Sequence, residues 1–303
     1  MKNKNIIIAV ISFLALSLMF NKVWASDDSF SFGILGDSDN FKYGKSNGGI
    51  QKAVKALSKK DIDFVISMGD IATSCKGNSS CRSKWTKWKK VVYADLPKVY
   101  SVMGNRDRSK SKADDLWQEL FDFPINGPNG FDELTYSFDY GNSHFVVLNT
   151  EKPNSHIIND DQRDWLDENL SDNQKENTFV FFHEPAWPVS SGIGKSLDVN
   201  PSERDSLWSI LADYNVTAVF SGHEHLYARK KINASVMPGV KNDIYQFIVG
   251  ETDVSKSKKP KSKTVDFYYR SKNYAVVSVD GKEITVRDYK VSGKKVDSFS
   301  FSK

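Results

Sequence analysis

Short apolar runs alternate with amphipathic stretches along most of the chain. Ile50, Ala53, Val54 and Leu57 fall three and four residues apart, a spacing that predicts one buried face of a helix. Further helices are expected at residues 82–92, at 113–121 and from 200 onward. Apolar runs typical of strands cover residues 30–35, 62–68, 99–103, 178–182 and 216–220.

The second half of the chain is richer in strands than in helices. One hairpin is expected at 135–149, with its turn at Gly141-Asn142, and another at 274–289, with its turn at Asp280-Gly281. Helix and strand alternation followed by strands predicts a layered α/β domain whose second sheet comes from the C-terminal part. No stretch has the composition of a linker, so residues 26–303 are expected to form one domain.

The first 25 residues have the pattern of a secretory signal peptide. Lys2 and Lys4 precede an apolar run at 6–20, and Val23-Trp24-Ala25 offers a small-residue cleavage site before Ser26. The run is shorter than the roughly 20 residues that a membrane-spanning helix needs. We therefore expect cleavage and a secreted or periplasmic protein without a membrane span, and an uncleaved anchor is the alternative.

Export changes how the charge and the cysteines are interpreted. Removing the leader takes away three lysines and no acid, so the formal net charge falls from +4 to +1 and no general field for nucleic acid remains. In an oxidising compartment Cys75 and Cys81 are expected to form a disulfide. A zinc-binding pair is the weaker alternative, because no second pair of thiols exists. With 39% hydrophobic and 26% charged residues, the composition is globular and excludes disordered, collagen-like and coiled-coil proteins.

Five of the predicted strands end at residues that can bind a metal ion. These residues are Asp37, Asp70, Asn105, His183 and His223. Ligands bind beyond the carboxyl ends of the strands in an open α/β sheet, so these side chains, with His225, are expected to converge. Carboxylates, an amide oxygen and imidazoles together suit Zn, Fe or Mn, and about seven ligands suit two ions rather than one. His144 is expected to be structural, and His156 lies in a polar loop where it could be merely exposed.

Five sequence blocks resemble those of the calcineurin-like metallophosphoesterases. They are Gly36-Asp37, Gly69-Asp70, Gly104-Asn105-Arg106-Asp107, His183 and Gly222-His223-Glu224-His225, in matching order and spacing. The segments 136–142 and 223–229 are most similar to the purple-acid-phosphatase-like branch. The resemblance covers the chain from about residue 30 to its end, and it implies a four-layer α/β/β/α sandwich with two mixed β-sheets.

The resemblance also implies two transition-metal ions, Mn, Fe or Zn. The ligands it implies are Asp37, Asp70 and His225 for the first ion and Asn105, His183 and His223 for the second, with Asp70 bridging them. A hydroxide that bridges the ions would attack phosphorus while both ions neutralise the developing charge. Asp70 and Asn105 are thereby implicated in catalysis, and Arg229 is a candidate contact for phosphate.

The chain departs from many members of this family at two positions near the expected ligands. Asp39 stands where many members have a His, two residues after the first Asp. It is either an oxygen ligand, which would favour Mn or Mg over Zn, or a turn residue, and both interpretations stay open. Thr73 stands where purple acid phosphatases carry a ligating Tyr, so tyrosinate-to-iron colour is not expected.

Arg106 is the largest departure, because most members place there a His thought to protonate the leaving group. An arginine cannot donate a proton at neutral pH, but it can bind phosphoryl oxygens. Loss of a general acid typically costs about 10²–10⁴ in rate, and substrates with good leaving groups suffer least. The same Gly-Asn-Arg-Asp block occurs in the active UDP-diacylglucosamine pyrophosphohydrolases, so arginine does not by itself imply an inactive site.

Two functions fit these observations. The first is an exported phosphoesterase that hydrolyses phosphate ester or pyrophosphate bonds of a small-molecule substrate with two metal ions. The alternative is a metal-stabilised phosphate-ester binding protein that has lost catalysis, which Arg106 and Asp39 favour. The loops at 151–161 and 190–200 are expected to select the substrate. The sequence does not choose an oligomeric state.

Overall fold

The computed structural model describes residues 28–45, 48–71, 77–108, 112–254, 258–262 and 264–303. Residues 1–25, Thr73 and Cys75 lie outside these ranges, so the signal peptide and the disulfide with Cys81 stay predictions. Among the described helices, none combines the length and the apolar character that crossing a bilayer requires.

Six strands form the first sheet, in the order β13-β12-β11-β1-β2-β3. The parallel strands are β1 (Ser29–Leu35), β2 (Phe64–Ser67) and β3 (Lys98–Ser101). The antiparallel strands are β11 (Asn273–Asp280), β12 (Glu283–Lys290) and β13 (Lys295–Ser302). Three helices lie outside this sheet: α1 (Gly49–Leu57), α2 (Asn78–Asp95) and α3 (Ala113–Leu120). The alternation of strand and helix in the sequence thus corresponds to crossover connections, which parallel strands require.

Seven strands form the second sheet, in the order β10-β8-β9-β7-β6-β5-β4. Its parallel part is β5 (Ser143–Val147), β6 (Asn177–Phe181), β7 (Ala218–Ser221) and β9 (Ile244–Val249). Its antiparallel strands are β4 (Tyr136–Tyr140), β8 (Tyr227–Ile232) and β10 (Phe267–Tyr269). The helices α4 (Asp160–Ser171) and α5 (Pro201–Asp213) cover its outer face, preceded by the short helix η1 (Leu197–Val199).

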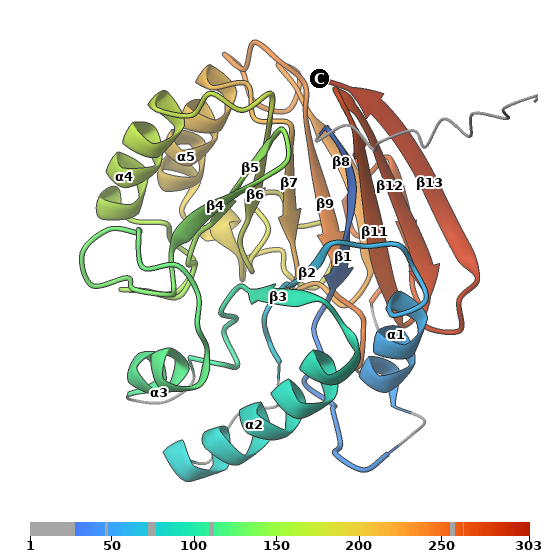
Figure 1. Cartoon of the computed structure of the whole chain (residues 1–303). Coiled ribbons are helices and arrows are strands. Elements are labelled where there is room, and N and C mark those ends of the chain that lie inside the picture. Colours follow the sequence, from blue (N-terminus) through green and yellow to red (C-terminus); the bar gives the residue numbers. More distant parts are fainter. Residues whose placement is uncertain (1–27, 46–47, 72–76, 109–111, 255–257, 263) are drawn as a thin grey trace, which may run out of the picture.

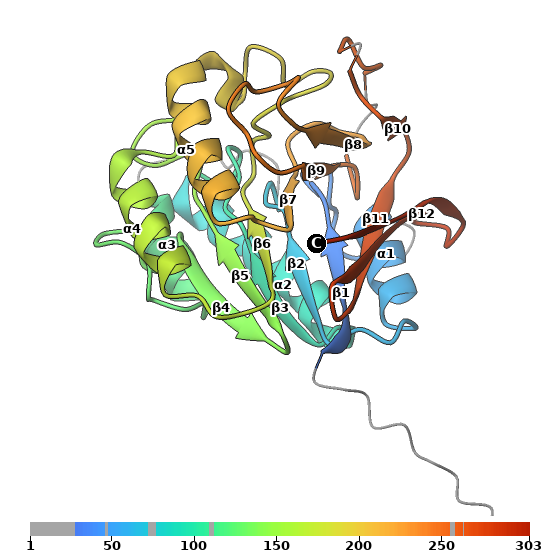
Figure 2. The same ribbon diagram turned by 90° about the horizontal axis from the view of Figure 1, so that it is seen from above.

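The two sheets face each other between the two groups of helices, as Figures 1 and 2 show. A buried aromatic cluster fills the space between them. Phe32 of the first sheet lies edge-on to Phe145 of the second, with 5.4 Å between ring centroids, and stacks on Phe64 at 5.3 Å. The expected four-layer sandwich of two mixed sheets is therefore confirmed.

The expected origin of the second sheet is wrong. Its strands come from the middle of the chain, and the C-terminal strands β11–β13 return to the first sheet. There β11 pairs with β1 along its whole length, from Ser29 opposite Asp280 to Leu35 opposite Tyr274. This pairing satisfies the backbone of a strand that would otherwise form an open edge. The helix α4 was also not predicted, because its polar sequence shows only a narrow apolar stripe at Leu166 and Leu170.

Candidate metal centre

Five parallel strands, drawn from both sheets, carry the predicted ligands at their carboxyl ends. Asp37 follows β1, Asp70 follows β2, and Asn105 follows β3. His183 follows β6 and His223 follows β7. Ligand atoms of Asp37, Asp70 and His183 all lie within 4.8 Å of one another, and all three residues are buried. The structure thus brings together, at one edge of the sandwich, residues that lie up to 186 positions apart in sequence.

Asp37 and His225 form one side of this centre. The Nε2 atom of His225 lies 3.5 Å from Oδ2 of Asp37, and the backbone N–H of His223 donates to Oδ1 at 3.1 Å. Burial lowers the pKa of His225, but the carboxylates of Asp37 and Asp39 have the larger, opposite effect and raise it to about 9. Asp39 is also buried, and its pKa is raised by burial and by Asp37. Asp39 therefore lies within electrostatic reach of Asp37, and its role as a metal ligand stays a prediction.

Asn105, His183 and His223 form the other side. The Oδ1 atom of Asn105 lies 3.1 Å from both Nε2 of His183 and Nδ1 of His223. The second ring nitrogen of His183 donates to the carbonyl oxygen of Met68 at 2.7 Å. Because a carbonyl only accepts, this bond keeps the proton on Nδ1 and leaves Nε2 as the nitrogen for a metal.

Asp70 lies between the two sides. Its Oδ1 atom accepts the backbone N–H of Arg106 at 2.7 Å and lies 3.5 Å from Nε2 of His183. Burial raises the pKa of Asp70 to about 7, with Asp37 adding to the rise and His183 opposing it. Its backbone takes the left-handed conformation, with φ at 47°, which is uncommon for a residue other than glycine.

The glycines next to the ligands are required by this close approach. A Cβ atom at Gly104 would lie 2.4 Å from Oδ1 of Asp70, and one at Gly222 would lie 2.6 Å from Oδ1 of Asp37. Real Cβ atoms do not approach other atoms so closely. The Gly-Asn and Gly-His pairs seen in the sequence therefore have a packing reason that is separate from their turns.

Residues 31–227 match the calcineurin-like phosphoesterase family. The chain belongs to this family. Purple acid phosphatase 13 of Arabidopsis thaliana is 28% identical over 155 residues, which make up 48% of this chain and 27% of that protein. Phosphoenolpyruvate phosphatase of Allium cepa is 25% identical over 218 residues, 67% of this chain and 42% of that protein. The match thus spans less than half the length of these curated relatives.

A solved structure shows the same fold. The purple acid phosphatase from yellow lupin (Lupinus luteus) seeds superposes with a TM-score of 0.74 at 19% identity, over 91% of this chain and 55% of that one. The calcineurin-like fold, with a purple acid phosphatase among its structural neighbours, is therefore shown for nearly the whole chain.

The donor set fits the divalent metals that this family uses. Oδ2 of Asp37 is buried and accepts no hydrogen bond from the described residues, so it is free to bind a cation. Burial and the neighbouring imidazole of His183 lower the pKa of His223 to about 3, so this ring is a neutral, metal-ready ligand. Two buried carboxylates, an amide oxygen and three imidazoles suit transition metals. That two ions bind, and which ones, stays a prediction.

Three residues that the sequence did not single out hold the ligand loops in place. The indole Nε1 of Trp88, on α2, donates to Oγ of Ser38 at 2.9 Å, and Ser38 lies between Asp37 and Asp39. The buried carboxyl group of Asp107 accepts the backbone N–H of Gly104 at 3.0 Å and that of Ile71 at 3.2 Å. The carboxyl group of Glu224 accepts three backbone N–H groups, from Val189 at 2.6 Å, Ser190 at 2.5 Å and Gly192 at 2.9 Å.

Arg106 and Arg229, the two arginines expected to contact phosphate, lie in different surroundings. The side chain of Arg106 is 49% exposed, and its Nε atom lies 4.0 Å from Oδ2 of Asp70, at the edge of the metal centre. Nε of Arg229 donates to Asp297 of β13 at 3.0 Å, and its guanidinium lies over the ring of Phe299 at 4.2 Å. These contacts give Arg229 a structural role between the sheets, and its contact with phosphate stays a prediction.

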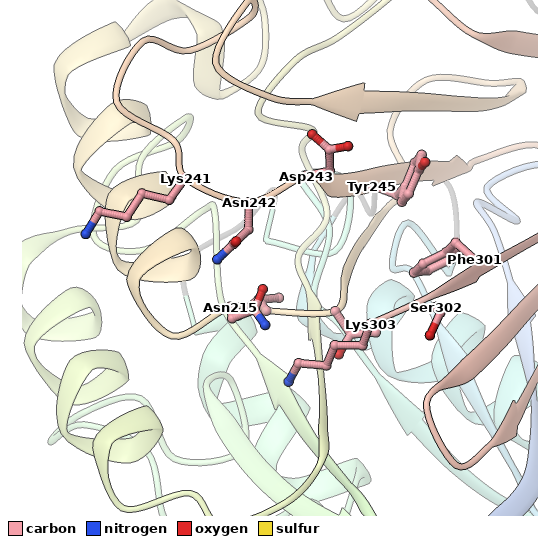
Figure 3. A pocket seen from close by; sticks show the side chains of 10 residues that line it. Asn215, Lys241, Asn242, Asp243, Tyr245, Phe301, Ser302 and Lys303 are labelled. Carbon is pink, nitrogen blue, oxygen red and sulfur yellow. The ribbon is translucent and has the colours of Figure 1, made fainter.

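A separate cavity lies at the opposite edge of the sandwich. It has a volume of about 500 Å³ and lies where β7 and β9 begin, between Thr217, Asp243 and Lys303 (Figure 3). None of the predicted ligands lines it. The chemistry expected of a calcineurin-like phosphoesterase therefore belongs to the carboxyl edge of the strands and not to this cavity.

Proposed function

We propose that this chain is an exported phosphoesterase that hydrolyses phosphate ester or pyrophosphate bonds of small molecules and holds two metal ions. The observation that carries the proposal is the convergence of Asp37, Asp70 and His183 within 4.8 Å, with Asn105 and His223 beside them. Membership in the calcineurin-like family and the matches to purple acid phosphatases support it. Export rests on the leader at residues 1–25.

The ligands divide between two positions that share one carboxylate. Asp37 and His225 would hold one ion, Asn105, His183 and His223 would hold the other, and Asp70 would lie between them. When bound, the ions would act as Lewis acids that activate water and neutralise the charge of the phosphoryl group.

The surrounding residues would position the substrate. Arg106 is anchored at its backbone by Asp70, while its half-exposed side chain can reach into solvent beside the centre. A guanidinium offers paired donors that match phosphoryl oxygens. Arg106 would therefore orient the phosphoryl group over the metals. It cannot supply a proton to the leaving group.

Hydrolysis by two matched variants tests this proposal. Asp70→Asn removes the shared carboxylate, and Asp280→Asn makes the same change at the exposed end of β11, outside the centre. Both would be purified as mature chains, loaded with Mn, Fe or Zn, and assayed with phosphomonoester, phosphodiester and pyrophosphate substrates. We expect Asp70→Asn to lose at least about 10²-fold in kcat/KM, with full activity in Asp280→Asn.

The outcomes separate the two functions. Full activity in folded Asp70→Asn would show that the two-metal mechanism is wrong. Binding of phosphate esters by the wild-type protein, with no turnover of any of the substrates, would favour the metal-stabilised binding protein instead. Export is tested on the processed protein, whose N-terminal sequence is expected to begin at Ser26; a chain that retains Lys2 would favour the anchor.

A further inference from the structure

A loop histidine lies beside the metal centre and is held by a buried carboxyl group. His156 follows β5, and its Nδ1 atom lies 2.8 and 2.7 Å from the two carboxyl oxygens of Glu184. Glu184 directly follows His183 in the chain and is completely buried. The side chain of His156 is 34% exposed, so the ring lies between the buried carboxyl group and solvent.

His156 also lies at the edge of the sheet that carries the ligands. Because β5 is parallel to β6, the loop after β5, which contains His156, leaves the sheet at the same edge as His183. The backbone oxygen of His156 accepts the side-chain N–H of Asn200 at 2.9 Å. This bond fixes the loop after β5 to the segment that precedes α5. His156 thus lies in the loop at 151–161 and is bonded to the loop at 190–200, the two loops that the sequence predicts to select the substrate.

The other four histidines of the chain are predicted ligands or have hydrogen-bond partners at both ring nitrogens. The sequence contains five, and three of them are the predicted ligands His183, His223 and His225. His144 lies in the β4–β5 hairpin, with Nδ1 2.6 Å from Asp139 and Nε2 2.8 Å from Asn169. His156 is therefore the one histidine that is neither a predicted ligand nor bonded at both ring nitrogens in the described structure. With Nδ1 on Glu184, its Nε2 has no hydrogen-bond partner among the described residues.

We propose that His156 donates the proton to the leaving group in the reaction proposed above. Water adds its oxygen to phosphorus and releases a proton to solvent, the bond from phosphorus to the ester oxygen breaks, and that oxygen keeps the electron pair. The ester oxygen takes the proton from Nε2 of His156 and leaves as an alcohol. The ring regains a proton from solvent, so the sum is ester plus water giving alcohol plus phosphate. Glu184 positions the ring through Nδ1, and Arg106 is left to bind phosphoryl oxygens.

Two substitutions separate proton donation from structure. His156→Asn keeps an amide N–H where Nδ1 bonds to Glu184 and lacks Nε2; asparagine also tolerates the left-handed backbone of this residue, whose φ is 66°. His156→Gln places an amide near the Nε2 position, and an amide cannot give up a proton at neutral pH. The control is Asp280→Asn, at the exposed end of β11 and outside the metal centre and the loops that are expected to select the substrate.

The readout is the dependence of kcat on the leaving group, measured with a series of phosphate monoesters from dinitrophenyl to alkyl. We expect both variants to lose about 10²–10³-fold on alkyl esters and less than about threefold on the dinitrophenyl ester, because a good leaving group needs no proton. Metal content, the affinity for inorganic phosphate and the thermal midpoint are expected to match those of the wild type. Asp280→Asn is expected to follow the wild type throughout.

The outcomes distinguish this inference from the proposed function on which it rests. Turnover by the wild type, with an equal loss on all esters or no loss in the His156 variants, would overturn proton donation alone. A loss of phosphate affinity or of metal in both variants would assign His156 a structural role and also overturn it. No turnover of any ester by the metal-loaded wild type would overturn the proposed function and the inference with it.

Discussion

Trp88 and Trp85 offer a matched pair that tests how α2 supports the metal centre. Both indoles are completely buried on this helix, three residues apart. Nε1 of Trp88 donates to Oγ of Ser38 at 2.9 Å, and Ser38 in turn donates from that Oγ to the carbonyl of Ile71 at 3.2 Å. Nε1 of Trp85 has no acceptor among the described residues. Replacing each tryptophan with phenylalanine removes the same atoms, but only one of the two substitutions breaks a hydrogen bond.

The difference between the two variants isolates that bond. Both changes lose the contacts of the larger ring and leave a cavity, so this part of the free energy of unfolding is similar. Trp88→Phe also loses a buried hydrogen bond, with a net value of about 0.5–1.5 kcal/mol, while Trp85→Phe removes a donor that was already unpaired. We therefore expect Trp88→Phe to be less stable than Trp85→Phe by about 1 kcal/mol. In a domain of this size, that corresponds to roughly 2 °C in the midpoint of thermal unfolding.

The two variants should also differ at the metal centre. Ser38 lies between Asp37 and Asp39 and donates its backbone N–H to the carbonyl of Asp70 at 3.0 Å. Loss of a group that supports a ligand loop typically lowers metal affinity by about 10–100-fold. The assays are urea unfolding of the metal-free proteins and titration with Mn or Zn. Equal stabilities together with equal metal affinities in Trp88→Phe and Trp85→Phe would refute the reasoning.

Three further predictions follow from the buried charged groups. Burial raises the pKa of Asp70 to about 7, and the nearby carboxylates raise the pKa of His183 to about 9 against the opposing effect of burial, so metal binding must displace protons. Metal affinity should therefore rise by up to about tenfold per released proton between about pH 6 and 9. A calorimetric titration that shows no proton release would contradict this prediction. Glu224→Ala leaves three N–H groups of the 189–192 loop without their acceptor and should lower the free energy of unfolding by about 3 kcal/mol. The stability of Glu224→Gln should lie between those of Glu224→Ala and the wild type. A change below about 0.5 kcal/mol for Glu224→Ala in urea unfolding would contradict the role of these bonds. Burial holds the pKa of Asp288 well above its ordinary value, so the folded protein keeps a proton that the unfolded chain releases above about pH 4, and the wild type loses stability as the pH rises toward the folded-state pKa. Asp288→Asn lacks this loss, so its stability relative to the wild type should rise between pH 4 and 8 by up to about 1.4 kcal/mol per unit; parallel pH profiles in urea unfolding would exclude this explanation.

The ligand positions could be predicted from the sequence because each follows a strand directly. Apolar strands that run parallel all end at the carboxyl edge of the sheet, so residues that follow them, such as Asp37 and His183, converge whatever the conformation of the loops. The same reasoning could not place β11–β13. Their alternating pattern fits either sheet, and pairing with β1 is decided by contacts across most of the chain.

The residues that support and complete the centre were beyond sequence reasoning for a related reason. The bond from Trp88 to Ser38 joins positions 50 residues apart, and no local sequence pattern indicates it. Glu184 is adjacent to a ligand, but only the fold shows that its carboxyl group holds His156 from another loop. Buried acids next to ligand blocks, Glu184 and Glu224 among them, were the available signal, because a carboxyl group is rarely buried without a partner.

The metal content of the mature protein tests the central claim most directly. The protein would be purified without chelators or a metal-binding tag, incubated with Mn, Fe and Zn, freed of unbound ions and analysed by mass spectrometry for metal per chain. The arrangement of Asp37 with His225 and of Asn105 with His183 and His223, joined at Asp70, predicts close to two equivalents. One equivalent or less after that incubation would contradict a two-metal phosphoesterase.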